Sequence, residues 1–118
     1  MKKRVKTIEK YNAMRYIKRE KQKDKSTMIK SFDDKETEKI FSGIQSRKLP
    51  GDIQRTALRK LKYISQAVTP EDLRVPPGNH FEALEGRTGF FSIRINDQWR
   101  ITFSWNDGTE NVKIEDYH

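Results

Sequence analysis

From residue 90 to residue 116 the sequence alternates between apolar and polar side chains, and this period of two restricts the C-terminal part of the chain to antiparallel strands. The expected strands are 81–84, 90–96, 99–105 and 111–116. Their apolar positions share one face of the sheet: Phe91, Ile93, Ile95, Trp99, Ile101, Phe103, Trp105, Val112 and Ile114. A sheet with one apolar face has to be covered by another layer.

Two helical segments come before these strands and can supply that layer. The first begins at Asp33 or Asp34, which can cap its N-terminus, and ends near Ile44. The second runs from Asp52 to Ala67. Its apolar residues recur at spacings of three and four: Ile53, Ala57, Leu61, Ile64 and Val68.

The predicted order of elements is β-α-α-β-β-β-β, with a short strand at Met28–Phe32 and a loop at Thr69–Asn79. This order is typical of a small α+β domain, with two N-terminal helices packed on one face of an antiparallel sheet. We expect the domain to occupy residues 28–118.

Keeping the apolar side chains on one face also fixes the strand register. The predicted pairs are Ile93–Ile101, Arg94–Arg100, Phe103–Val112 and Arg100–Glu115, with a four-residue turn at Asn106–Thr109. Arg94, Arg100 and Glu115 then form one row on the helix-free face, beside Tyr117. Two neighbouring arginines there indicate an anion site for phosphate. The alternative is that Glu115 neutralises both arginines.

The net charge of +8 is concentrated at the N-terminus. Residues 1–27 contain eleven Lys and Arg against three acidic residues, whereas residues 28–118 are balanced. We therefore expect 1–27 to be a basic extension, helical over about 5–21. Such an arm attracts nucleic acid by neutralising phosphates. The alternative is a solvated tail.

A second basic stripe follows the outer side of the second helix. Arg55, Arg59 and Lys62 recur at spacings of four and three, away from the apolar stripe. A solvated helix face and contact with an RNA backbone both fit this pattern.

Composition excludes several classes of protein. The chain has no Cys, which excludes a disulfide framework, a zinc–thiolate site and a Cys nucleophile. It has no apolar run of membrane-spanning length and no apolar signal-peptide segment, so we expect a cytoplasmic protein without membrane contact. We also expect neither a metal nor a cofactor, because no acidic or His cluster has ligand spacing and no Gly-rich phosphate loop occurs.

The last four residues, Glu115-Asp116-Tyr117-His118, can all carry or exchange protons. Ile114 anchors the final strand only four positions from the end, so the tail should be well placed. His118 is the better general acid or base, because histidine ordinarily titrates near neutral pH. His80, the other histidine, follows Gly-Asn in a loop and is expected at the surface.

Four segments carry a resemblance to a known family: MIKSF at Met28–Phe32, PPGN with FEALEG at Pro76–Gly86, SIRINDQWRITF at Ser92–Phe103 and the terminal EDYH. They resemble the HigB-type toxins, the "plasmid maintenance killer" branch of the RelE/ParE superfamily. The resemblance covers residues 28–118 and none of 1–27, and INDQWRI with the terminal DYH is its most specific part.

The resemblance implies a compact toxin that cleaves mRNA in the ribosomal A site and is neutralised by a HigA-type helix-turn-helix antitoxin, through which alone it reaches operator DNA. It implies that the catalytic residues are Arg100, Asp116, Tyr117 and His118, with Arg94 as a further RNA contact. Some members have Lys before the loop glycine, where this chain has Glu85 before Gly86. That departure removes a basic group, which should affect the rate more than the reaction class.

Two alternatives stay open. A ParE-like inhibitor of DNA gyrase shares the fold, but its tail would lack the acid and base residues that this chain has. A plain nucleic-acid-binding module would depend on residues 1–27 and would still bind after loss of Tyr117 and His118.

Overall fold

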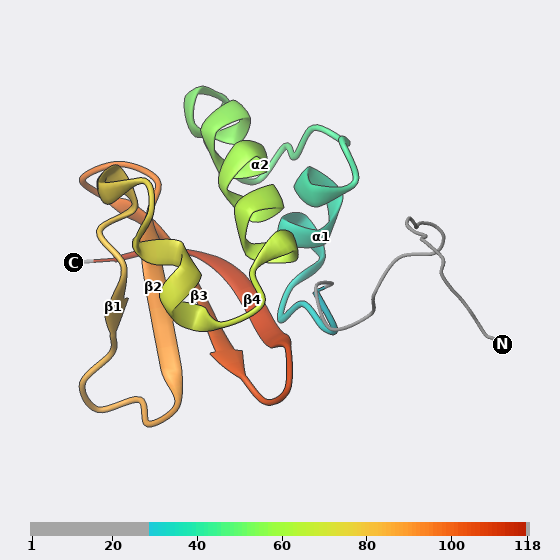
Figure 1. Cartoon of the computed structure of the whole chain (residues 1–118). Coiled ribbons are helices and arrows are strands. Elements are labelled where there is room, and N and C mark those ends of the chain that lie inside the picture. The colour runs from blue at the N-terminus through green and yellow to red at the C-terminus, as the bar shows by residue number, and fades with distance from the viewer. Residues whose placement is uncertain (1–28, 118) are drawn as a thin grey trace, which may run out of the picture.

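The polar and apolar segments of this chain assemble into two helices and a four-stranded sheet, which a computed structural model describes for residues 29–117 (Figure 1). In chain order the elements are α1 (Lys35–Phe41), α2 (Gly51–Gln66), the short 3₁₀ helices η3 (Pro70–Arg74) and η4 (Pro77–Asn79), and strands β1 (Glu82–Ala83), β2 (Phe90–Arg94), β3 (Trp99–Trp105) and β4 (Thr109–Asp116). The predicted arm at 1–27, its helix over 5–21, Met28 and His118 lie outside the described residues.

The sheet is antiparallel throughout, in the order β1-β2-β3-β4, and the two helices pack on one of its faces (Figure 1). This confirms the predicted α+β architecture. Within residues 29–117 no helix is both long enough and apolar enough to cross a membrane.

The core forms where the apolar stripe of α2 meets the apolar face of the sheet. Leu61 of α2 and Phe103 of β3 are both fully buried in it. Burial of each such side chain contributes about 1.5–3 kcal/mol. The other buried residues of this core cluster are Ile40, Ile53, Ala57, Ile64, Ala67, Leu73, Ile93, Ile95, Ile101, Val112 and Ile114.

Helix α1 begins as predicted but ends earlier. The Asp34 carboxylate caps it by accepting from the Thr37 backbone N–H at 2.6 Å. Its last residue is Phe41, because Gly43 takes a positive φ of 84° and the Ile44 N–H turns back to the Lys39 carbonyl. The predicted helical end at Ile44 is therefore wrong, and Ile44 is 56% exposed.

Helix α2 also ends before the last residue of the predicted apolar stripe. It ends at Gln66, and Val68 is 60% exposed rather than part of the core stripe. The Asp72 carboxylate accepts from the Val68 and Thr69 backbone N–H groups, and these hydrogen bonds hold both residues at the start of η3. The segment Thr69–Asn79, predicted as a loop, thus contains two 3₁₀ turns.

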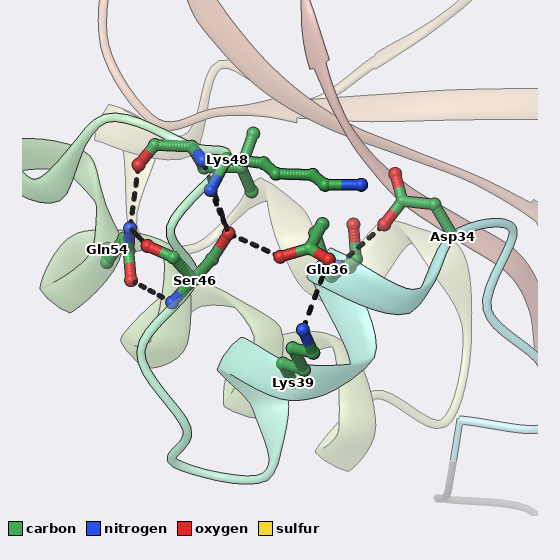
Figure 2. Close-up of polar contacts among 8 residues, drawn as sticks. Asp34, Glu36, Lys39, Ser46, Lys48 and Gln54 are labelled. Carbon is green, nitrogen blue, oxygen red and sulfur yellow. Dashed lines mark hydrogen bonds and ion pairs between the residues drawn. The ribbon is translucent and has the colours of Figure 1, made fainter.

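A polar network joins the two helices (Figure 2). The buried Ser46 hydroxyl donates to Glu36 at 2.6 Å, and the Gln54 side chain exchanges two hydrogen bonds with the Ser46 backbone. The hydrogen bond from Ser46 lowers the pKa of Glu36. These contacts fix the connection between α1 and α2 and with it the placement of α2 on the sheet.

The predicted register of the first hairpin is confirmed, with Ile93 opposite Ile101 and Arg94 opposite Arg100. Strand β2 ends at Arg94 rather than at residue 96, and β1 is limited to residues 82–83. Strand β3 has the predicted bounds of 99–105.

The second hairpin is partly as predicted. Arg100 lies opposite Glu115, but the register shifts between Thr102 and Ser104, so the predicted Phe103–Val112 pair is replaced by a β-bulge. Asn111 adopts a positive φ of 58° there. Trp105 pairs with Thr109, which leaves three residues in the turn instead of four and starts β4 at 109 instead of 111.

Residues 29–32 of the strand predicted at 28–32 run parallel to β4 through two isolated bridges, Ile29–Thr109 and Phe32–Val112. Hydrogen bonds from the Lys30 N–H to the Thr109 carbonyl and from the Val112 N–H to the Ser31 carbonyl hold them there. They are therefore an edge contact of the sheet rather than a continuous strand.

Candidate active site

Arg100 is the centre of the polar face of the sheet. It follows the alternation of β3, so its side chain lies on the face opposite Ile101 and the helices. Its side chain is nevertheless buried, with the residue only 7% exposed. A buried guanidinium needs partners for its donors, and the chain supplies three of different kinds.

Each partner of Arg100 comes from a different part of the chain. Nε donates to the Ser92 hydroxyl at 2.8 Å, and Nη2 donates to the His80 backbone carbonyl at 2.7 Å. Nη2 also forms an ion pair with Glu82 at 3.1 Å. Burial lowers the pKa of Arg100 and the Glu82 carboxylate opposes that shift, and an arginine stays charged in a protein. Within residues 29–117 the hydrogen bonds and the ion pair of Arg100 use Nε and Nη2 and leave Nη1 without either.

Of the described C-terminal residues, Tyr117 reaches this arginine and Asp116 contacts Gln98 instead. The Tyr117 ring lies 5.6 Å from Arg100 Cζ, and its backbone N–H donates to the Gln98 carbonyl at 2.7 Å. Asp116 lies opposite Trp99, and its carboxylate accepts from the Gln98 amide at 3.0 Å. The tail is therefore held to the β2–β3 turn as far as Tyr117. His118, the remaining predicted catalytic residue, lies outside the described residues.

Arg94 stands beside Arg100, and we call these two residues the arginine pair. Arg94 is half-buried and contacts Asp97 at 3.4 Å, an exposed partner three residues along. Exposed ion pairs of this kind contribute about 0–1 kcal/mol. A phosphate can displace such a partner at little cost.

Glu115 does not neutralise the arginine pair. Although it is opposite Arg100 in register, its carboxylate pairs with Arg87 at 3.2 Å and accepts from the Thr102 hydroxyl at 2.5 Å. The carboxylate that pairs with Arg100 belongs to Glu82. Among residues 29–117, this leaves Arg94 paired only with the exposed Asp97.

The three basic residues of α2 lie elsewhere. Arg55, Arg59 and Lys62 are exposed on the outer side of the helix, away from its buried stripe. The arginine pair lies on the opposite face of the sheet. The structure therefore does not bring this basic stripe together with Arg100.

Glu82 and Lys60 are two site neighbours that the sequence reading missed. Glu82 carries no pattern that distinguishes it from other acidic residues. Lys60 does carry a signal, because it falls on the buried side of α2 between Ala57 and Ile64, where an apolar residue is expected. Its ammonium donates to the Arg94 carbonyl at 2.6 Å.

The remaining titratable residues near the site are dispersed. His80 is exposed, at a positive φ of 46°, and only its backbone carbonyl reaches Arg100. Glu85, at the position where some HigB-type toxins have Lys, is exposed in the turn after β1. Within residues 29–117 no three His, Cys, Asp or Glu side chains come together as a group that could hold a metal ion.

Two helices on one face of an antiparallel sheet, with the arginine pair and Tyr117 on the other, form the α+β architecture that the sequence resemblance implies. The family model described as "HigB-like_toxin: RelE-like toxin of type II toxin-antitoxin system HigB" matches residues 30–118. The chain therefore belongs to the HigB-like toxins, as the sequence resemblance indicated.

Two relatives agree with this assignment. Toxin HigB-1 of Vibrio cholerae is 42% identical over 83 residues, which cover 69% of this chain and 87% of that protein. An uncharacterized protein of Haemophilus influenzae is 36% identical over 72 residues, which cover 60% of this chain and 71% of that one. As a toxin of a type II toxin–antitoxin system, the chain has an antitoxin as its partner.

Proposed function

We propose that this toxin is a ribosome-dependent endoribonuclease that cleaves mRNA and thereby inhibits translation and growth. The observation that carries the proposal is the environment of Arg100. Its guanidinium is held by Ser92, His80 and Glu82, with Cζ near the Tyr117 ring, and no hydrogen bond or ion pair of the described residues uses Nη1. Arg94 lies opposite Arg100 on the neighbouring strand. A guanidinium held in this way suits a phosphate whose negative charge increases in the transition state.

The reaction we propose is attack of the RNA 2′-hydroxyl on the adjacent phosphate. A base removes the hydroxyl proton, the P–O5′ bond breaks, and an acid protonates the departing 5′-oxygen. The products are a 2′,3′-cyclic phosphate and a 5′-hydroxyl. We expect no metal to be needed, because the substrate supplies the nucleophile and the arginine pair supplies positive charge.

The residues divide between these roles. Arg100, with Arg94, stabilises the charge on the phosphorane. Asp116 and His118 are candidates for the base and the acid, and the Glu82 carboxylate beside Arg100 is a third candidate. Tyr117 can stack on a base or orient the phosphate. The outer stripe of α2, made of Arg55, Arg59 and Lys62, would contact RNA away from the reacting phosphate.

The partners we propose follow from the family. They are a HigA-type helix-turn-helix antitoxin, the ribosome with its mRNA, and operator DNA reached only through the antitoxin. We therefore expect the toxin to act in the cytoplasm, where translating ribosomes are.

A test of the proposal is inducible expression of the full chain in a bacterium, with mapping of new 5′ ends on mRNA. Wild type should arrest growth and produce 5′-hydroxyl ends within translated codons, whereas Arg100→Ala should lose about 10²–10³-fold of the cleavage rate. Lys35→Ala, which removes an exposed cation at the start of α1, is the control and should behave as wild type.

The two alternatives give different outcomes in the same experiment. Growth arrest without mRNA cleavage, relieved in cells with a resistant gyrase, would support the ParE-like inhibitor. RNA binding without cleavage, lost on removal of residues 1–27, would support the nucleic-acid-binding module.

A further inference from the structure

Lys60 is a buried cation to which the proposed reaction assigns no role. It lies on the sheet-facing side of α2 and is only 6% exposed. Lysine is almost never buried to this degree without a partner of opposite charge. Among residues 29–117 no carboxylate forms an ion pair with it, and its ammonium donates instead to two backbone carbonyls, those of Arg94 at 2.6 Å and Gly78 at 3.4 Å.

The two carbonyls belong to the backbone segments that hold the arginine pair. Arg94 is the last residue of β2 and one member of the pair. Gly78 lies in η4, two residues before His80, whose carbonyl accepts from Arg100 Nη2 at 2.7 Å. One ammonium thus joins α2 both to the strand that carries Arg94 and to the loop that holds Arg100.

Stability alone does not account for a lysine at this position. Burial lowers the pKa of Lys60, and the positive charges of Arg59, Arg94 and Arg100 lower it further. Burial of a charge is costly, and no carboxylate among residues 29–117 pairs with Lys60 to offset that cost. A methionine would continue the apolar stripe of Ala57 and Ile64 without the cost of repulsion from the arginine pair.

We propose that Lys60 is a positioning residue for the arginine pair, holding the end of β2 and the η4–His80 loop at the spacing that the reacting phosphate requires. The kinetic consequence of this inference rests on the proposed nuclease function, whereas its structural consequence does not. Lys60 touches no substrate and acts only through Arg94 and Arg100. Misplacement of such groups by about 1 Å can cost about 100-fold in rate.

The kinetic experiment compares the full-length chain with Lys60→Met and Lys60→Arg in single-turnover and steady-state cleavage of mRNA on purified ribosomes. Lys60→Met keeps the side-chain volume but removes the donors, and should lower kcat about 10- to 100-fold with little change in KM. Lys60→Arg keeps a cationic donor and should restore a large part of kcat. Lys35→Met, at an exposed position on α1, is the matched control and should leave both constants unchanged.

A second readout does not need activity. The Nε–H group of Arg100 donates to buried Ser92, so its NMR signal should be resolved and slow to exchange with solvent. Lys60→Met should shift this signal and speed its exchange, and Lys35→Met should not. If wild type cuts no mRNA while this response is seen, the nuclease proposal fails and the positioning role of Lys60 stands.

Three results would overturn the inference. The first is Lys60→Met with the kcat of wild type. The second is an Arg100 Nε–H signal that does not respond to the substitution. The third is failure of both Lys60→Met and Lys60→Gln to fold in circular dichroism and urea melts, because Lys60 would then be required for stability rather than for positioning.

Discussion

Arg100 of β3 and Glu82 of β1 form an ion pair over the intervening strand β2, with Nη2 3.1 Å from the carboxylate oxygen. The arginine is buried and the carboxylate half exposed, so the pair is solvated mainly from the Glu82 side. Glu82 therefore fixes the guanidinium and at the same time cancels part of the charge that a phosphate would meet.

The first prediction follows from that cancellation. Glu82→Gln should tighten binding of a 2′-O-methyl RNA oligonucleotide, which cannot be cleaved, by a few-fold at low salt, because one negative charge leaves the site. Fluorescence anisotropy measures this affinity. Glu38→Gln, at an exposed position on α1, is the control. Weaker binding by Glu82→Gln would mean that orienting Arg100 matters more than the charge removed.

The second prediction concerns the core. Leu61→Ala should lower the free energy of unfolding by about 2–5 kcal/mol, because Leu61 is fully buried between α2 and the sheet. Ile44→Ala should change it by less than about 0.5 kcal/mol, because Ile44 is largely exposed beyond the end of α1. Urea melts of the three proteins test both values. Equal costs at the two sites would show that Ile44 belongs to the core after all.

The third prediction concerns acid sensitivity. Hydrogen bonds from the Val68 and Thr69 backbone N–H groups lower the pKa of Asp72 below its ordinary value. A carboxyl whose pKa is lower in the folded state stabilises the fold above its unfolded pKa of about 4 and loses this contribution as pH falls through the folded pKa. The Tm of Asp72→Ala should therefore be lower than that of wild type at pH 7. Between pH 4 and pH 2 it should fall by less than the Tm of wild type.

Thermal melts across that pH range, with Glu71→Ala as the neighbouring control, measure the effect. Parallel curves for Asp72→Ala and wild type would contradict the prediction.

The fold could be predicted from the sequence wherever side-chain periodicity decides the structure. Strand β3 and the sheet-facing stripe of α2 follow from spacing alone, because burial of one face selects the register. The helix ends could not be predicted this way. Ile44 and Val68 continue the apolar spacing, but the backbone has already left the helix at Gly43 and at the Asp72 cap.

The candidate site, too, could be predicted from the sequence only in part. The neighbouring positions of Arg94 and Arg100 follow from the strand register, which the alternation reveals. The partners of Arg100 do not, because the His80 carbonyl and the Glu82 carboxylate are brought to it by the path of the chain after α2. Backbone carbonyls have no sequence signature, so the contacts of Lys60 could not be read from the chain either.

The fourth prediction concerns residues 1–27. Their deletion should leave folding, toxicity and antitoxin binding largely intact, because within residues 29–117 the buried core cluster is continuous from Ile40 to Ile114. It should reduce the salt dependence of RNA binding, since the segment carries the net charge of +8. The affinity for an RNA oligonucleotide, measured from about 50 to about 200 mM salt, gives the slope of log affinity against log salt concentration. A truncated chain that does not fold would make this segment part of the domain.

The last prediction concerns His118. Its removal should abolish or greatly reduce growth inhibition while leaving the fold intact. The last buried core residue is Ile114, and the tail is held as far as Tyr117 by the hydrogen bond to Gln98, so a shortened chain keeps its described contacts. General acid–base catalysis contributes about 10²–10⁴-fold, enough to turn a toxin into a tolerated protein. Unfolding melts confirm the fold, and mRNA end mapping measures cleavage. If the shortened chain still cuts mRNA on the ribosome, the acid or base lies elsewhere, with Asp116 and Glu82 the remaining candidates. If it arrests growth without cutting mRNA, the target is gyrase rather than the ribosome.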